Sequence, residues 1–235
     1  EVHHHLPEVL TLKTPDELAE LPSFLTKTHA FDALSVTDED RQRTTTIIAG
    51  ASREKLRSQL NPEEYKKSLG IRARVFKADD QHLARITQLI NKTNQMNLTT
   101  IRRTQDEVRA LMHNSEYLVL GLETRDKYGD DGLVGVAIIK KPSDAAVLDT
   151  FLMSCRVLGR DIETAFLAVI AAHARGLRCQ TLKARYIETA KNQPAKDMLS
   201  QHGFSPAANG QDWFISLTHA PNMPPHIDCT LPPEN

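Results

Sequence analysis

Cys155 is the residue whose type and position best suit covalent chemistry. It lies between an apolar strand pattern and a helical pattern, in the run Ser154-Cys155-Arg156-Val157-Leu158-Gly159-Arg160. A helix N-terminus and neighbouring guanidinium groups favour a thiolate, which is the form of cysteine that attacks an acyl group. A single cysteine at a strand end is more often a buried packing residue. The sequence therefore leaves two interpretations open for Cys155, an acyl-accepting nucleophile or a structural residue.

Two further segments combine polar side chains with turn signals. Residues 92–100, which we call the amide-rich segment, read Lys-Thr-Asn-Gln-Met-Asn-Leu-Thr-Thr and follow a helical pattern. Residues 191–195 read Lys-Asn-Gln-Pro-Ala, and His-Gly-Phe follows at residues 202–204. Amide and hydroxyl side chains of this kind usually hydrogen-bond within a loop or cap a helix. Each segment by itself therefore indicates local structure rather than a function.

Taken in order and at their spacing, the three segments resemble the FkbH-like proteins. The amide-rich segment is similar to the KTNQFNLTT signature of that family, and residues 154–160 and 191–204 also match it. The family loads a three-carbon glyceryl unit from a glycolytic phosphoester onto an acyl carrier protein for polyketide-type biosynthesis. The resemblance implies that Cys155 is the catalytic acyl acceptor. It also implies substrate or pantetheine contacts for Asn94, Asn97, Thr99, Arg156, Gly159, Arg160 and Asn192, with the two arginines as thiolate or phosphate partners.

From Ile71 onward the predicted order is strand, helix, helix, three strands, helix, strand, helix, strand. This order is similar to that of the GNAT acyltransferase fold, and it implies a GNAT-like mixed α/β sheet flanked by helices over residues 71–218. GNAT proteins bind the pyrophosphate of coenzyme A at a helix N-terminus through Gln/Arg-x-x-Gly-x-Gly/Ala. Here Asp161 replaces the last small residue and its charge opposes a phosphate, while Leu199 replaces the usual proton-donating tyrosine. Ordinary coenzyme A chemistry is therefore disfavoured.

Residues 1–70 have a mostly helical pattern of their own. The resemblance implies that they are the C-terminal remnant of a HAD-like phosphatase domain. They lack the Asp-x-Asp-x-Thr/Val motif that supplies a phosphatase with its nucleophile and Mg²⁺ ligands. We therefore expect no phosphatase activity and no cofactor in this chain, with Mg²⁺ confined to the missing HAD part. Because residue 1 is Glu, we expect the chain to be a fragment of a longer protein or a processed chain.

The pattern of residues 1–70 also predicts individual elements. A strand is expected over residues 9–12 and a helix over residues 15–29. A polar helix should begin after a cap at Ser35 or Thr37 and continue through Arg57. At the other end of the chain, residues 219–235 carry a proline-rich tail, which we expect to be an extended strap or disordered.

Composition and charge exclude several functional classes. Lys and Arg total 29 against 30 Asp and Glu, so no global field favours nucleic acid or a membrane surface. Three cysteines without a CxxC pair, Cys155, Cys179 and Cys229, fit a reducing cytosol and do not predict a metal site. No apolar run reaches the roughly 18 residues of a membrane span. We expect a soluble, cytoplasmic protein without nucleic-acid or membrane partners.

Three functions remain open from the sequence. The resemblance implies glyceryl transfer to an acyl carrier protein, whose 4'-phosphopantetheine supplies the thiol and whose donor is a glycolytic acyl phosphate or its thioester. One alternative is a coenzyme A-dependent GNAT N-acyltransferase. The other is a non-catalytic module that docks a carrier protein. Uptake of an acyl group by Cys155 separates glyceryl transfer from docking.

Overall fold

The computed structural model describes residues 10–28, 38–141 and 145–231, and the chain divides into two compact units between Thr44 and Thr45. The first unit contains η1 (Leu18–Glu20), α2 (Leu21–Lys27) and the start of α3 (Asp38–Arg57). η1 and α2 bury none of their side chains. The strand predicted near residue 10 is absent from the described residues 10–12. The predicted caps Ser35 and Thr37 lie outside the described residues.

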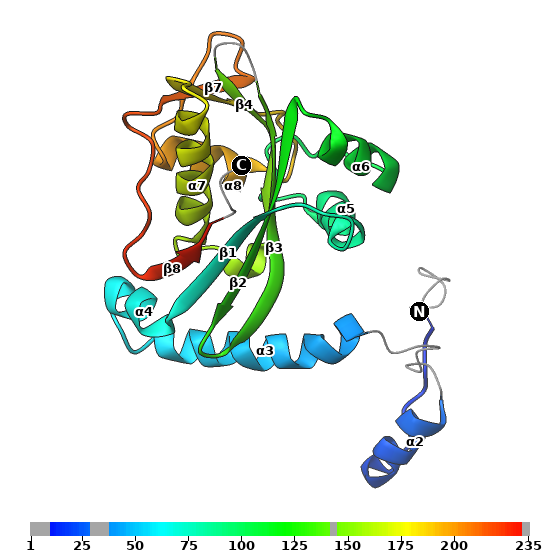
Figure 1. Ribbon diagram of the computed structural model, residues 1–235. Helices are drawn as coiled ribbons and strands as arrows, with labels where there is room; N and C mark the ends of the chain where they lie inside the picture. Colours follow the sequence, from blue (N-terminus) through cyan, green and yellow to red (C-terminus); the bar gives the residue numbers. More distant parts are fainter. Residues whose placement is uncertain (1–9, 29–37, 142–144, 232–235) are drawn as a thin grey trace. The chain divides into compact units, whose positions relative to one another are not determined.

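The second unit is built on a mixed sheet in the order β6-β7-β5-β4-β3-β2-β1-β8 (Figure 1). β1 to β4 are antiparallel neighbours, whereas β4 with β5 and β1 with β8 are parallel pairs. The strands are β1 (Ile71–Lys77), β2 (Tyr117–Asp126), β3 (Gly129–Lys140), β4 (Ala146–Met153), β5 (Thr181–Arg185), β6 (Ser205–Pro206), β7 (Asp212–Ser216) and β8 (Ile227–Thr230). This mixed sheet, flanked by helices in the expected order, confirms the predicted fold class.

Helices cover both faces of the sheet. α5 and α6 pack on one face, and α7 and α8 on the other (Figure 1). The helices of this unit after α3 are α4 (Pro62–Leu69), α5 (Leu83–Lys92), α6 (Gln105–His113), η2 (Cys155–Val157), α7 (Ile162–Gly176) and α8 (Gln193–Gln201). The capping box predicted at Thr104 and Glu107 begins α6, with both reciprocal hydrogen bonds present. α7 is apolar on most of its surface because it is buried in the larger core.

The division of the chain differs from the boundary predicted at residue 70. The second unit begins at Thr45, because α4 buries Tyr65 and Leu69 in the same core as the sheet. The proline-rich tail also contains a strand, β8, which pairs in parallel with β1 and buries Ile227. Residues 227–230 of the predicted strap are therefore the edge of the sheet. No helix in the described ranges has the length and apolar character needed to cross a bilayer.

Candidate functional site

The two edges of β4 differ. Toward β3, β4 is paired from Val147 to Met153, whereas its pairing with β5 covers Ala146 to Leu148. A register shift in the β3–β4 ladder leaves Asp149 as an extra residue between Leu148 and Thr150. A bulge bends its strand and interrupts pairing. Past Asp149, the β5-side edge of β4 is therefore available to another segment.

The amide-rich segment occupies that edge. The Leu98 N–H donates to the Phe151 carbonyl at 3.0 Å, and the Met153 N–H donates to the Met96 carbonyl at 2.9 Å. On its other side, the Leu98 carbonyl accepts the Ile187 N–H at 2.9 Å. The segment thus forms an isolated antiparallel bridge, Asn97 with Leu152, and lies between β4 and the chain that follows β5.

Asn192, in the segment at residues 191–195, is hydrogen-bonded to the amide-rich segment. Its fully buried side-chain amide donates to the Asn97 carbonyl at 3.1 Å and to the Ile187 carbonyl at 2.9 Å. Its Oδ1 accepts from the Thr189 N–H at 2.8 Å and from the Tyr186 hydroxyl at 3.1 Å. All four hydrogen-bonding positions of the amide are used. The predicted contact of Asn192 with substrate stays a prediction, and its observed contacts position the neighbouring segments.

The three residues predicted to line a channel in the amide-rich segment have different environments. Asn97 is buried and shapes its own loop, since its Oδ1 accepts the N–H groups of Thr99 and Thr100 at 3.2 and 2.9 Å. Asn94 is exposed and accepts a hydrogen bond from Arg102. Thr99 is buried, and within the described part of the chain its hydroxyl has no hydrogen-bond partner. Asn94 is therefore the member of this set that solvent reaches.

Cys155 follows the part of β4 that is bonded to the amide-rich segment. It is the first residue of η2, directly after β4, and its side chain is exposed. The preceding Ser154 N–H donates to the Val134 carbonyl at 2.7 Å, which fixes the chain at this exit from the sheet. Two residues before Cys155, Met153 bonds to the amide-rich segment, which in turn bonds to Asn192. Hydrogen bonds therefore connect segments far apart in the sequence, and the chain continues from the end of β4 to an exposed thiol.

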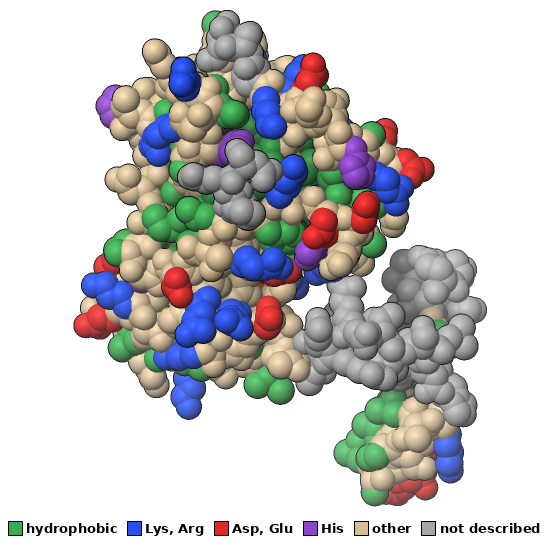
Figure 2. Space-filling view, viewed as in Figure 1, with side chains coloured by type: hydrophobic (Ala, Val, Ile, Leu, Met, Phe, Trp, Pro, Cys, Tyr) green, Lys and Arg blue, Asp and Glu red, His purple; other side chains and the backbone are tan. Residues whose placement is uncertain are grey.

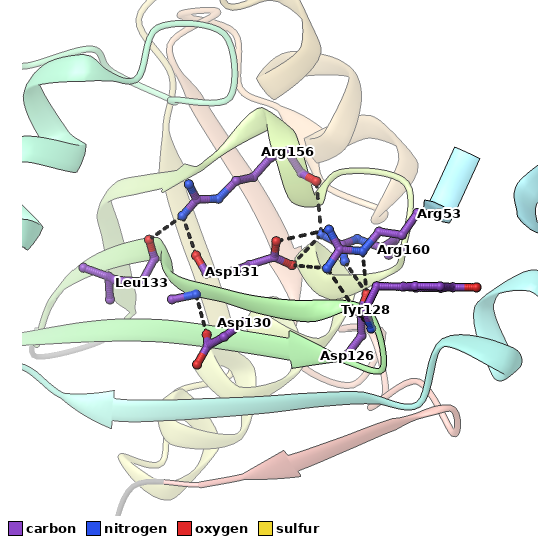
Figure 3. Close-up of polar contacts among 9 residues, drawn as sticks. Arg53, Asp126, Tyr128, Asp130, Asp131, Leu133, Arg156 and Arg160 are labelled. Atoms are coloured by element: carbon purple, nitrogen blue, oxygen red, sulfur yellow. Dashed lines mark hydrogen bonds and ion pairs between the residues drawn. The ribbon is translucent and has the colours of Figure 1, made fainter. Parts of the chain in front are cut away.

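The two arginines that follow Cys155 contact the β2–β3 hairpin. Arg160 is buried, and its Nη1 and Nη2 lie 2.9 Å from Asp126 Oδ2 and 3.0 Å from Asp131 Oδ2 (Figure 3). Arg156 donates to the main-chain carbonyls of Asp131 and Leu133. Their predicted role as thiolate or phosphate partners stays a prediction, and these contacts give it no support.

Arg160 belongs to a buried group of two arginines and two aspartates, which we call the arginine–aspartate cluster: Arg53, Asp126, Asp131 and Arg160 (Figure 3). Arg53 of α3 binds Asp126 through Nε at 2.7 Å and Nη2 at 2.9 Å. Burial opposes ionisation of Asp126, but hydrogen bonds from Arg53 and the Tyr128 N–H, with the arginine charges, lower its pKa. The cluster holds α3, the hairpin and the turn before α7 together. No sequence motif indicated it.

The turn before α7 contains two residues with positive φ, and an acidic side chain lies at the helix N-terminus. Gly159 has a φ of 76°, and Asp161 has a φ of 62°, which is unusual for a residue with a side chain. The Asp161 carboxylate lies 2.9 Å from Lys66 Nζ and 3.6 Å from His226 Nε2. The hydrogen bond to Asp161 raises the pKa of Lys66. A pyrophosphate at this helix end would meet a carboxylate, so the residues present do not fit coenzyme A in that position.

The position of the missing tyrosine is a packing site. Leu199 is fully buried in the core. The nearby His202 has both ring nitrogens engaged: Nδ1 lies 2.8 Å from the Met198 carbonyl and Nε2 lies 2.8 Å from the Thr164 hydroxyl. Because a carbonyl can only accept, Nδ1 carries the proton and Nε2 accepts from Thr164. His202 thus has a structural role at the end of α8.

Asp149 and Arg103 were missed by the sequence analysis. Arg103 Nη2 lies 2.7 Å from Asp149 Oδ2, and this pair connects the loop after the amide-rich segment to the bulge of β4. The Arg103 Nε is buried and has no partner within the described part of the chain. A bulge follows from pairing across strands, so the sequence around Asp149 carries no signal for it. Within the described residues, no cluster of His, Cys, Asp and Glu is arranged to hold a metal.

The chain was compared with protein families, curated proteins and solved structures. No protein-family model and no curated protein matches the chain. Solved structures similar to it include a putative acetyltransferase of the GNAT family from Desulfovibrio desulfuricans, with 16% identity, 62% of this chain and 99% of that chain covered, and a TM-score of 0.49. Spermidine N-acetyltransferase from Vibrio cholerae, in complex with CoA and spermine, has 12% identity, 63% and 96% coverage, and a TM-score of 0.47. The ribosomal-protein-S18-alanine N-acetyltransferase from Escherichia coli has 14% identity, 61% and 90% coverage, and a TM-score of 0.45.

Two of these neighbours are named as N-acetyltransferases and one as a putative acetyltransferase, and similarity at this level assigns no chemistry to this chain. The names of these three proteins mention neither FkbH-like nor HAD proteins. The resemblance of the three segments to FkbH-like proteins therefore remains an expectation from the sequence.

Proposed function

We propose that this chain transfers an acyl group held as a phosphopantetheine thioester, and that Cys155 accepts the acyl group. The observation that carries the proposal is the exposed thiol of Cys155, which follows the end of β4, where β4 is bonded to the amide-rich segment and through it to Asn192. A transfer site needs an accessible nucleophile on a rigid support. The buried, fully bonded Asn192 supplies rigidity at this point.

The proposed step is a thioester exchange. The Cys155 thiolate attacks the thioester carbonyl, a bond forms between that carbon and Sγ, and the bond from carbon to the pantetheine sulfur breaks. The released thiolate takes a proton from solvent. Attack on the Cys155 thioester by a second pantetheine thiol returns the acyl group and completes the transfer.

The finer version of the proposal is glyceryl transfer to an acyl carrier protein. It is supported by the resemblance of the three segments to FkbH-like proteins and by their proximity in the fold. The same arrangement also suits a module that docks a carrier protein without forming a covalent bond. Only uptake of an acyl group distinguishes the two.

A coenzyme A-dependent N-acyltransferase is the second candidate, favoured by the order of elements and the Arg-x-x-Gly turn at Arg156. Two observations oppose it. The Asp161 carboxylate lies at the helix end where pyrophosphate is expected, and the β5-side edge of β4 is already paired with Leu98. In this version the acyl group passes directly to an amine, and Cys155 is not needed.

Intact-protein mass spectrometry tests the proposal. We expect a glyceryl thioester of pantetheine to add one glyceryl mass to the protein, with loss of the adduct in Cys155→Ala and its retention in Cys179→Ala. Both variants remove one thiol, so the second controls for non-specific acylation. An adduct that survives in Cys155→Ala contradicts the proposal.

A calorimetric titration with acetyl-CoA separates the candidates. Binding at micromolar concentration without a covalent adduct would favour the N-acyltransferase. Binding of a carrier protein with neither an adduct nor acetyl-CoA binding would favour the docking module.

A further inference from the structure

A charged groove lies on the sheet at a place that the transfer site does not use. It encloses about 360 Å³ where β1, β2 and β8 run side by side. Its charged lining consists of three arginines and three acids: Arg72, Arg74, Arg125, Glu123, Asp130 and Asp228. Positive and negative side chains are interspersed over this part of the sheet (Figure 2). We call it the β1–β8 groove.

Two of the three arginines face each other across β1 and β2, and within the described residues no acid forms an ion pair with either side chain. Arg72 and Arg125 are direct partners across β1 and β2, and both side chains are exposed. Like charges in such a pair destabilise a sheet. Arg74 is different, since its Nη2 lies 2.6 Å from Glu123 Oε2. Within the described part of the chain, neither Arg72 nor Arg125 has a hydrogen-bond or ion-pair partner.

We propose that the β1–β8 groove binds a small phosphate monoester between Arg72 and Arg125. A guanidinium group offers two parallel N–H donors, which match two oxygens of a phosphate. Two such groups on one face provide the charge that a phosphate dianion requires. The volume of the groove suits a small molecule.

The acidic side chains of the groove determine which functional groups the ligand has besides its phosphate. Asp228 is the partner of Arg72 across β1 and β8, and Asp130 is the partner of Arg125 across β2 and β3. One oxygen of Asp130 accepts the Gly132 N–H at 2.7 Å, which leaves its other oxygen for a ligand. Carboxylates accept hydrogen bonds from hydroxyl groups and repel further anions. The groove therefore selects a hydroxylated ligand with a single phosphate over a polyanion.

Calorimetry with glycerol 2-phosphate as the probe tests this proposal, with malonate as the comparison ligand at the same ionic strength. We expect Arg72→Ala and Arg125→Ala each to weaken binding by about tenfold or more, since each removes charge-assisted hydrogen bonds. Arg109→Ala is the matched control, because Arg109 is an exposed arginine on α6 outside the groove. The affinity of the Arg109→Ala variant for glycerol 2-phosphate should equal that of the unaltered protein.

Thermal unfolding without ligand separates binding from folding. Arg72→Ala and Arg125→Ala relieve a repulsion, so neither should lower the melting temperature, while both should lose the upward shift that the phosphate ester produces. Absence of binding at millimolar concentration overturns the proposal. So does tighter binding of malonate than of the phosphate ester, or an equal loss of affinity in Arg109→Ala.

Discussion

The arginine–aspartate cluster and the β1–β8 groove lie on either side of the β2–β3 hairpin and use the same residue type in opposite ways. In the cluster, Arg53 and Arg160 are buried and each binds both aspartates. In the groove, Arg72 and Arg125 are exposed and lack a partner in the described chain. Carboxylates lie on the strands beside both pairs of arginines, but only the buried pair forms bonds to them, so burial and pairing separate the structural arginines from the two that we propose to bind a ligand.

The strongest test of this comparison is Arg160→Ala. Removing Arg160 leaves Asp126 and Asp131 buried with one guanidinium between them, and loss of one partner of a buried ion pair costs about 3–5 kcal/mol. We expect a corresponding fall in the free energy of unfolding, measured by urea denaturation. Arg74→Ala is the control, because its pair with Glu123 is partly exposed and contributes less than about 1 kcal/mol. Equal effects of the two changes would remove the distinction.

Asn192→Ala tests whether a buried group of neutral hydrogen bonds contributes to the free energy of unfolding as the arginine–aspartate cluster does. The substitution leaves the Asn97 and Ile187 carbonyls and the Thr189 N–H without their partner. Unsatisfied buried groups cost about 1–3 kcal/mol, so we expect a loss in this range. Hydrogen exchange should also become faster at the Leu98 and Ile187 amides. Asn209→Ala removes hydrogen bonds at an exposed turn, so it should lower stability less and leave exchange at the Leu98 and Ile187 amides unchanged.

The pH dependence of stability should report the cluster through Asp126. Its pKa in the folded protein lies below the ordinary value of 3.8, so its contribution to stability is complete above pH 3.8 and is lost as the pH falls through the folded pKa. Asp126→Asn should therefore flatten the acid limb of the stability curve measured between pH 5 and pH 2. Because the change also breaks the cluster, the slope and not the absolute stability is the quantity to compare. An unchanged slope contradicts the assigned shift.

The smallest expected effect on the free energy of unfolding is that of a substitution in the β1–β8 groove. Without ligand, Arg72→Ala should raise the free energy of unfolding by a few tenths of a kcal/mol, about the size of a cross-strand repulsion. Replicate urea denaturation can resolve this against Arg109→Ala. A loss of 1 kcal/mol or more, roughly the worth of a hydrogen bond, would indicate that Arg72 has a structural partner after all.

Local chemistry allowed much of the fold to be predicted. Residues 146–153 were predicted as a strand and form β4, and the Thr104 capping box begins α6 where expected. α4 ends before Gly70, which has the left-handed conformation that such a stop requires. These features depend on residues within a few positions of one another. Spacing and composition are therefore enough to specify them.

The candidate site depended on contacts that no local pattern contains. The sequence indicated Cys155 and the amide-rich segment, but the bonding of that segment to β4 depends on β5 pairing with β4 only as far as Leu148, which leaves the rest of the edge to residues some fifty positions earlier. Arg160 was predicted beside a thiolate, yet it binds the hairpin because two aspartates and Arg53 converge there when the sheet packs against α3. The sequence by itself determined the elements and the reactive residue types. Tertiary packing decided which charges meet, because burial makes an unpaired charge costly only once distant segments have come together.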